Sequence, residues 1–205
     1  MRQSTLALAL LPLCAQAVDI EIGTGATHYK TAHDGLWYQE AYPHTFDLQS
    51  VPMSFGVSGE RNGIRYRAEY LYLGWMYNAS QWVSDKDYYP GSPVVPTRHG
   101  VGRGSAAGIV LSASRHVPLF GLPFYAEAGA WVHVAKYKIT VTNTMTGSFG
   151  DYEAPRSWHV GPAIGFGIRY SGVDVGVKYL GMQQSEDGSY PVYDHAYVLE
   201  TKVYF

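Results

Sequence analysis

The chain has little cysteine, little charge and no long apolar run. Cys14 is the only cysteine in 205 residues, so an intramolecular disulfide framework is excluded. No segment approaches the roughly 20 consecutive apolar residues of a transmembrane helix. Charged residues make up 16% of the chain, and 15 basic against 17 acidic residues give no indication of electrostatic binding to nucleic acid.

The first 17 residues have the pattern of an export signal. Arg2 supplies the positive charge, Leu6–Leu13 a short apolar core, and Ala15–Ala17 a small-x-small cleavage site. Cleavage there predicts a single cysteine-free domain of residues 18–205. Two alternatives stay open: an uncleaved anchor, disfavoured by the short apolar run, and a lipoprotein lipidated at Cys14, disfavoured by the large residue before it.

Glycine and aromatic residues are abundant instead, with 23 Gly, 18 Tyr and 5 Trp. Tyr and Trp suit a membrane–water interface, because the ring favours hydrocarbon and its polar edge favours water. An exported chain without a spanning helix can still cross a membrane as a closed β-barrel, since closure leaves no backbone edge unpaired in lipid.

Eight segments alternate apolar and polar residues with period two, as strands with one lipid face and one lumen face must. We expect strands at about 19–29, 50–59, 64–77, 105–117, 124–141, 157–170, 173–183 and 197–205. Short turns follow the second, fourth and sixth strands, and long links lie at 30–49, 78–104, 142–156 and 184–194. This alternation predicts an all-β fold: an eight-stranded antiparallel up-and-down transmembrane β-barrel with its turns and both ends in the periplasm.

Charged side chains fall on the inward faces of these strands. An eight-stranded barrel is just wide enough for its side chains to fill, and buried charges of both signs predict a paired ionic core. A soluble lipocalin-like barrel would instead place apolar residues inside. The predicted lumen network is Arg65, Arg67, Glu69, Glu127, His133, His159, Arg169, Lys178, Glu200 and Lys202, with Asp174 also inward.

The inward histidines, His133 and His159, lie on neighbouring strands. Two imidazoles without a third ligand at fixed spacing are weak evidence for a metal, so we expect polar lumen residues and no metal or cofactor.

Three segments carry a resemblance to a known group. Phe124–Ala130 resembles the aromatic-x-Ala-x-Ala-Gly strand of small OmpA-like and OmpX-like outer-membrane β-barrel proteins, and Gly161–Tyr170 is similar to the glycine-rich strand that follows it. Val203–Phe205 resembles the terminal signal read by the barrel-assembly machinery. The resemblance implies a monomer in the bacterial outer membrane, with outer-membrane lipid or lipopolysaccharide and, through Phe205, the assembly machinery as partners.

Aromatic residues with interspersed charge in the long links predict external recognition surfaces, at Trp37, Tyr38, Trp82, Tyr88 and Tyr89. We therefore expect a non-enzymatic barrel with a structural, adhesive or surface-interaction role, for which the sequence identifies no extracellular ligand. Two alternatives stay open. One is a narrow ion channel along Arg65, Arg67 and Glu127; the other is a lipid A-modifying enzyme using His28 or His33, although no serine signature accompanies them.

Overall fold

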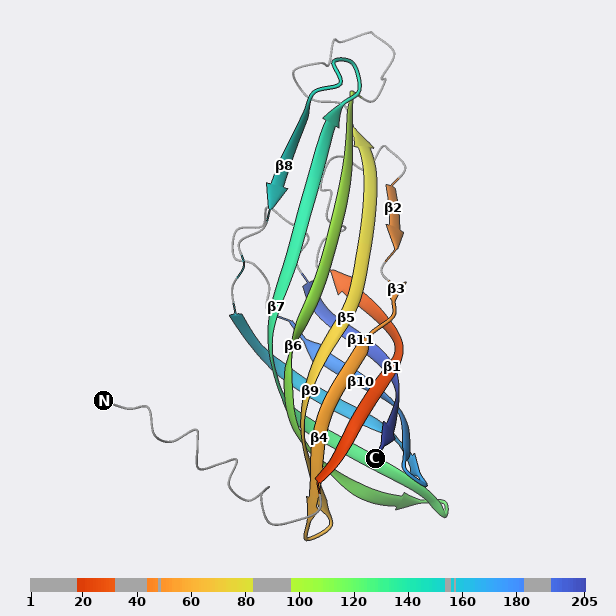
Figure 1. Cartoon of the computed structure of the whole chain (residues 1–205). Helices are drawn as coiled ribbons and strands as arrows, with labels where there is room; N and C mark the ends of the chain where they lie inside the picture. Colours follow the sequence, from red (N-terminus) through yellow and green to blue (C-terminus); the bar gives the residue numbers. More distant parts are fainter. Residues whose placement is uncertain are drawn as a thin grey trace, which may run out of the picture.

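Eight antiparallel strands form a closed ring (Figure 1). The computed structural model describes residues 18–31, 44–47, 49–82, 97–153, 156, 158–182 and 193–205. The ring consists of β1 (Val18–Thr31), β4 (Met53–Arg61), β5 (Ile64–Trp82), β6 (Arg98–Leu119), β7 (Leu122–Asn143), β9 (Trp158–Tyr170), β10 (Val173–Gly181) and β11 (Tyr193–Tyr204). The predicted all-β, eight-stranded antiparallel barrel is confirmed.

The last strand closes the ring against the first. β11 pairs with β1 over eleven residue pairs, from Glu21↔Tyr204 to Thr31↔Tyr193. Beyond this ladder the Ile20 N–H donates to the Phe205 carbonyl at 3.1 Å, and the Phe205 N–H donates back at 3.0 Å. No helix in the described part of the chain is long and apolar enough to cross a membrane.

Three two-residue turns lie together at one end of the barrel, which we call the turn end (Figure 1). Each has positive φ at both central residues, the conformation whose twist matches that of the flanking strands. The central pairs are Asn62-Gly63 (φ 55° and 71°), Phe120-Gly121 (53° and 75°) and Ser171-Gly172 (46° and 83°).

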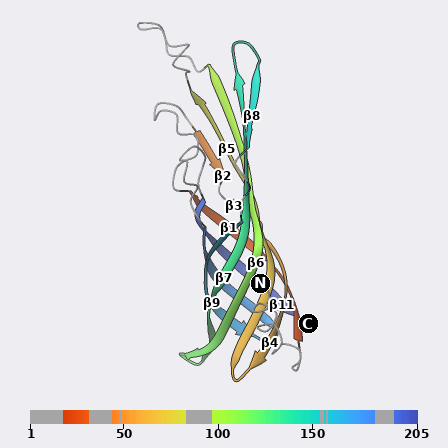
Figure 2. The same ribbon diagram turned by 90° about the vertical axis from the view of Figure 1, so that its left-hand side faces the viewer.

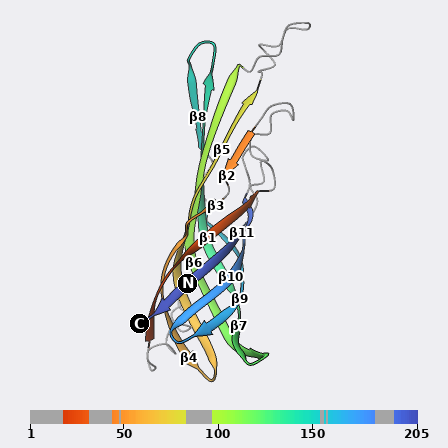
Figure 3. The same cartoon turned by 90° about the vertical axis from the view of Figure 1, so that its right-hand side faces the viewer.

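At the other end, one side of the barrel rises far beyond the ring (Figures 1, 2 and 3). β6 and β7 have 22 residues each, about twice the 9–11 that a membrane-crossing strand needs. The short strands β2 (His44–Asp47) and β8 (Phe149–Glu153) pair with β5 and β7 there, and β3 (Gln49–Ser50) pairs with β1. We call residues 75–82, 98–105 and 136–143, together with β2 and β8, the projecting sheet.

The projecting sheet corrects three predicted links. Residues 78–82 and 98–104 pair with one another as strand, for example Asn78↔Gly102. β8 lies inside the predicted 142–156 link, and β2 lies inside the predicted 30–49 link. The alternation is hidden there because the inward face of β6 is glycine, at Gly100, Gly102 and Gly104. Backbone pairing does not need side chains, so the ladder continues where the sequence pattern stops.

A bulge in β5 changes which of its residues face the lumen. The β5–β6 register shifts between Tyr72 and Trp75, and Leu73 and Gly74 are both buried although they are neighbours. Gly74 has φ +80°, and its carbonyl accepts a 2.9 Å hydrogen bond from the Tyr29 hydroxyl. Above the bulge Trp75 therefore faces outward, 66% exposed.

Pro162 of β9 forms no bulge, although proline cannot donate to a strand ladder. Pro162 pairs in regular register with Ala130 of β7. On the side toward β10, the β9–β10 ladder ends at the pair Ala163↔Leu180, next to Pro162, because proline has no N–H with which to continue it. Gly181 accommodates the ring, because a Cβ there would lie 2.6 Å from Pro162 Cδ.

Replacing Gly74 by alanine is expected to destabilise the barrel by about 2–3 kcal/mol, because it adds left-handed strain to a steric clash. The new Cβ would lie 1.9 Å from Ser50 Oγ and 2.7 Å from the Val51 carbonyl. Gly63→Ala is the matched control, since its φ of +71° is similar but nothing lies within 4 Å. Urea unfolding should show about 1 kcal/mol for the control; equal losses at the two positions would contradict the packing argument.

Candidate functional site

The outer face of the ring is apolar and exposed. Along β7 the outward residues run from Phe124 to Val134 before the first lysine, and eleven tilted strand residues span about 25 Å, the height of a membrane barrel's apolar band. A soluble barrel has the opposite partition, with apolar residues inside. We call this surface the apolar belt; it includes Ile20, Ile22, Phe55, Tyr70, Ile109, Leu111, Ile164, Phe166, Val175, Val177 and Leu199.

Arg67 of β5 lies at the centre of the charged part of the lumen, with 4% of its surface exposed. Its Nε lies 2.6 Å from the Glu21 carboxylate, and its Nη1 pairs with Glu127. Its Nη2 lies 3.2 Å from Asp174 and donates a 2.7 Å hydrogen bond to the Tyr204 hydroxyl. These partners belong to β1, β7, β10 and β11, so one guanidinium connects four strands to its own.

Two buried lysines form a second centre beside Arg67. Lys178 of β10 pairs with Glu69, and its Nζ lies 3.1 Å from Glu127 and 3.4 Å from Glu200. The Nζ of Lys202 lies 2.5 Å from Glu69 and 3.0 Å from Glu200. Glu127 thus contacts both Arg67 and Lys178, which joins the two centres into one network.

Nearer the turn end, Asp174 accepts a bidentate pair from Arg169, with both distances 2.8 Å, and a hydrogen bond from Tyr204. Arg65 lies at the solvent-exposed edge of the network. Its Nη1 is 3.0 Å from the Asp19 carboxylate, and its guanidinium carbon is 4.7 Å from the centre of the Tyr204 ring.

This ionic layer contains charges of both signs in nearly equal number. Five carboxylates face four basic side chains, and such pairing is the condition under which buried charges are tolerated. The acids are Glu21, Glu69, Glu127, Asp174 and Glu200, and the bases are Arg67, Arg169, Lys178 and Lys202, while Arg65 pairs with Asp19 at the edge of the layer. The structure brings together every charged residue of the predicted lumen network and adds Glu21. The sequence placed Glu21 on the polar side of its strand but not among the inward charges.

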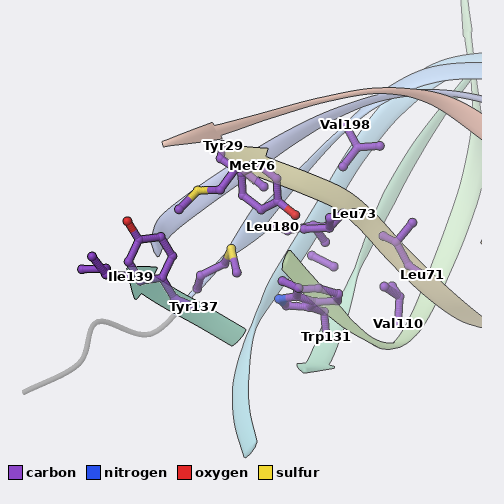
Figure 4. Packing of buried hydrophobic residues seen from close by; sticks show 14 residues of the cluster. Tyr29, Leu71, Leu73, Met76, Val110, Trp131, Tyr137, Ile139, Leu180 and Val198 are labelled. Carbon is purple, nitrogen blue, oxygen red and sulfur yellow. The ribbon is translucent and has the colours of Figure 1, made fainter. Parts of the chain in front are cut away.

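Above the ionic layer the lumen is apolar (Figure 4). Trp131, Leu73, Val110 and Leu180 are at most 1% exposed and pack with Tyr29 into one cluster. Buried residues of the projecting sheet continue it, among them Tyr137 and Ile139. We call this the apolar layer. It is a second layer of buried side chains in the lumen, which the sequence prediction of a paired ionic core did not include.

The two predicted lumen histidines lie at the edge of the apolar layer. His133 and His159 are register partners with ring centres 5.8 Å apart, and His133 stacks on Trp131 at 4.4 Å. Within the described residues no group of three or more His, Cys, Asp or Glu could hold a metal ion.

Most of the predicted recognition residues lie outside the described residues: Trp37, Tyr38, Tyr88 and Tyr89, as does His33. Trp82 is the last residue of β5, in the projecting sheet. His28 is exposed on the outer face of β1, level with Tyr197, whereas the hydroxyl of its neighbour Thr27 is buried on the lumen side. This pair is therefore not arranged as nucleophile and base.

The outer face of the projecting sheet is polar and carries an ion pair. Lys138 Nζ lies 2.6 Å from Asp151 of β8, which also accepts a 2.7 Å hydrogen bond from Thr140. The hydrogen bond from Lys138, and then that from Thr140, lowers the pKa of Asp151. The same hydrogen bond to Asp151 raises the pKa of Lys138.

We expect β8 to loosen at low pH. Because the folded-state pKa of Asp151 lies below its unfolded value of about 3.8, the contact stabilises β8 above that value and is lost as pH falls through the lower one. Amide exchange in β8, corrected for intrinsic rates, should therefore stay constant from neutral pH down to about pH 4 and accelerate as the pH falls further. Asp151→Asn should abolish the acceleration; an unchanged pH dependence in that variant would contradict the assignment.

The comparisons with known proteins bear on the fold. Neither a protein-family model nor a curated protein matches the sequence. The crystal structure of the outer-membrane protein OprG from Pseudomonas aeruginosa is similar with a TM-score of 0.51 and 12% identity, covering 93% of this chain and 97% of OprG. This chain has the fold of a small outer-membrane β-barrel protein.

Two further structures are similar over comparable lengths. Ail of Yersinia pestis, in complex with the heparin analogue sucrose octasulfate, has a TM-score of 0.48 at 8% identity, over 92% of this chain and 97% of Ail. Neisserial surface protein A has a TM-score of 0.41 at 12% identity, over 92% and 97% of the two chains.

Proposed function

We propose that the protein is a non-enzymatic, monomeric barrel of the bacterial outer membrane, of the OmpX-like kind, that presents a recognition surface outside the cell. The observation that carries the proposal is the projecting sheet. Three neighbouring strands, β5, β6 and β7, continue well beyond the apolar belt at the end opposite the tight turns. Membrane barrels place their short turns in the periplasm, so the projecting sheet faces the exterior.

The lumen supports a structural role. The ionic layer and the apolar layer both cross it, and their side chains are buried. An ion entering the barrel would have to displace the charge pairs and then cross the buried apolar layer. The packing of Arg67, Lys178 and Trp131 therefore supports a closed lumen rather than a pore.

Planar-bilayer recording tests the closed lumen. The mature chain inserted into a bilayer bathed in potassium chloride is expected to give no sustained open-channel steps, since both layers block the path. Steps in the nanosiemens range would overturn the proposal in favour of a narrow channel.

Adhesion tests the recognition surface. Beads coated with the refolded protein should adhere to cultured epithelial cells, and beads carrying a variant with residues 83–96 replaced by a short glycine–serine link should adhere less, because only the link between β5 and β6 is changed. The variant's heat-modifiable gel migration provides the folding control. Equal adhesion of the two proteins, or none by either, would contradict this role.

The terminal strand supports assembly through the barrel-assembly machinery. Phe205 is 73% exposed on the outer face, beside Ile20 at the seam between β11 and β1. Deleting Phe205 should lower the amount of folded barrel in the membrane fraction while leaving refolding in detergent unchanged; loss of refolding would assign the residue to barrel stability instead.

A further inference from the structure

Three basic side chains share one outward-facing patch directly above the apolar belt: Arg103 of β6, and Lys136 and Lys138 of β7. All three are exposed. Arg103 is the direct register partner of Lys138, and Lys136 lies two residues along the same strand, about 7 Å away. We call these three residues the basic edge.

The register fixes the height of the basic edge. The top row of the belt is Tyr72, Ala107, Val134 and Trp158, which are successive register partners. The next outward row is Trp75, Ser105 and Lys136, and the row above it contains Tyr77, Arg103 and Lys138. Indole and phenol rings mark the interface of a membrane barrel, so the basic edge lies at the level of the lipid headgroups.

Like charges directly opposite one another on adjacent strands are destabilising, so a pair of this kind points to an anion that compensates for it. Arg103 and Lys138 form such a pair on a face that points toward lipid. Carboxylates flank the row: Asp151 is bonded to Lys138, Glu153, the register partner of Lys138 on β8, lies 3.8 Å from Arg156, and Asp47 of β2 is the register partner of Tyr77. Arg103 itself has Tyr77 and Lys138 as its two register partners, and neither is a carboxylate.

We propose that the basic edge binds the phosphate of an anionic lipid headgroup in the outer leaflet, with Trp75 and Trp158 against the adjoining acyl chains. Arg103 supplies a planar fork for phosphate oxygens, and the lysines supply point charges on either side. The assignment rests on the proposed membrane location. The site adds a defined lipid contact at the level where the projecting sheet leaves the headgroup layer.

Quenching of tryptophan fluorescence by brominated lipid tests the site, because Trp75 is 66% and Trp158 71% exposed beside it. The mature chain is refolded into phosphatidylcholine bilayers that contain phosphatidylglycerol, with the bromines on one lipid or the other near the headgroup end of the chain. The two quenching curves give the relative affinity for the anionic lipid. Wild type is expected to favour phosphatidylglycerol by about fivefold or more, since each basic side chain near a lipid surface contributes a factor of about five.

Two variants decide the outcome. Arg103→Gln with Lys136→Gln and Lys138→Gln should reduce the preference to near one, whereas Asp151→Asn should increase it by removing the nearby carboxylate. Arg61→Gln with Arg115→Gln, at the turn end, is the matched control and should leave it unchanged. If both lipids quench equally in wild type, the headgroup site is overturned while the membrane barrel stands. If neither lipid quenches, the membrane location itself is wrong.

Discussion

Replacing Arg67 by alanine is expected to destabilise the barrel by about 3–5 kcal/mol, because removal of one partner leaves buried charges uncompensated. Glu21, Glu127 and Asp174 would each lose a cation, and the Tyr204 hydroxyl would lose a donor. The partners lie on four strands, so the loss should loosen the whole ring. Urea unfolding of the refolded protein in lipid vesicles, followed by tryptophan fluorescence, measures the effect.

Arg65→Ala is the matched control for Arg67. It lies two residues away on the same face of β5, but its side chain is 15% exposed and its partners, Asp19 and Glu60, are 36% and 48% exposed. Ion pairs accessible to solvent contribute about 0–1 kcal/mol. If the two variants lose the same stability, the ionic layer is hydrated and the account of a closed, charge-paired lumen is wrong.

The second large effect is expected for Trp131→Ala, which should cost about 3–5 kcal/mol through the cavity it leaves in the apolar layer. Trp131 is fully buried and stacks on His133, and Leu73, Val110 and Leu180 belong to the same cluster (Figure 4). The same urea titration measures the loss. The variant should also admit water into the upper lumen, detectable as faster exchange of the β7 amides near position 131.

Trp158→Ala is the matched control for Trp131→Ala, because it removes the same residue type from a position outside the lumen. Trp158 is close to Trp131 on the neighbouring strand but is 71% exposed on the outer face, beside Val134. Its removal should cost clearly less than that of Trp131, because lipid can fill the vacated space and no internal cavity forms. Equal effects of the two substitutions would show that the apolar layer is not a packed seal.

Much of the ring was predictable because period-two alternation depends only on which face each residue occupies. Arg67, Glu69 and Lys178 alternate with aromatic or apolar neighbours, so their inward direction is visible in the sequence. Their partners were not visible, because each lies on a strand distant in the chain. Glu21 was left out of the charged set for a related reason: Gly23 and Gly25 follow it on the same face, and only the ring brings Arg67 against it.

The apolar layer and the bulge were beyond the sequence pattern. At Leu71, Tyr72 and Leu73 both faces of β5 carry apolar or aromatic residues, so alternation no longer distinguishes lumen from lipid. The bulge occurs at Gly74, where positive φ allows it, and not at the proline of β9. The length of the projecting sheet was hidden in the same way, by glycine on β6.

If the apolar belt faces lipid in the outer membrane, the folded barrel should be found in the outer-membrane fraction. Gel mobility of unheated against boiled fractions, after expression without a tag at Phe205, measures this. We expect a heat-modifiable band in the outer-membrane fraction, because the closed ring with its charge-paired lumen resists detergent until heated. A single band in the soluble periplasmic fraction, with no shift on boiling, would show that the belt does not face lipid.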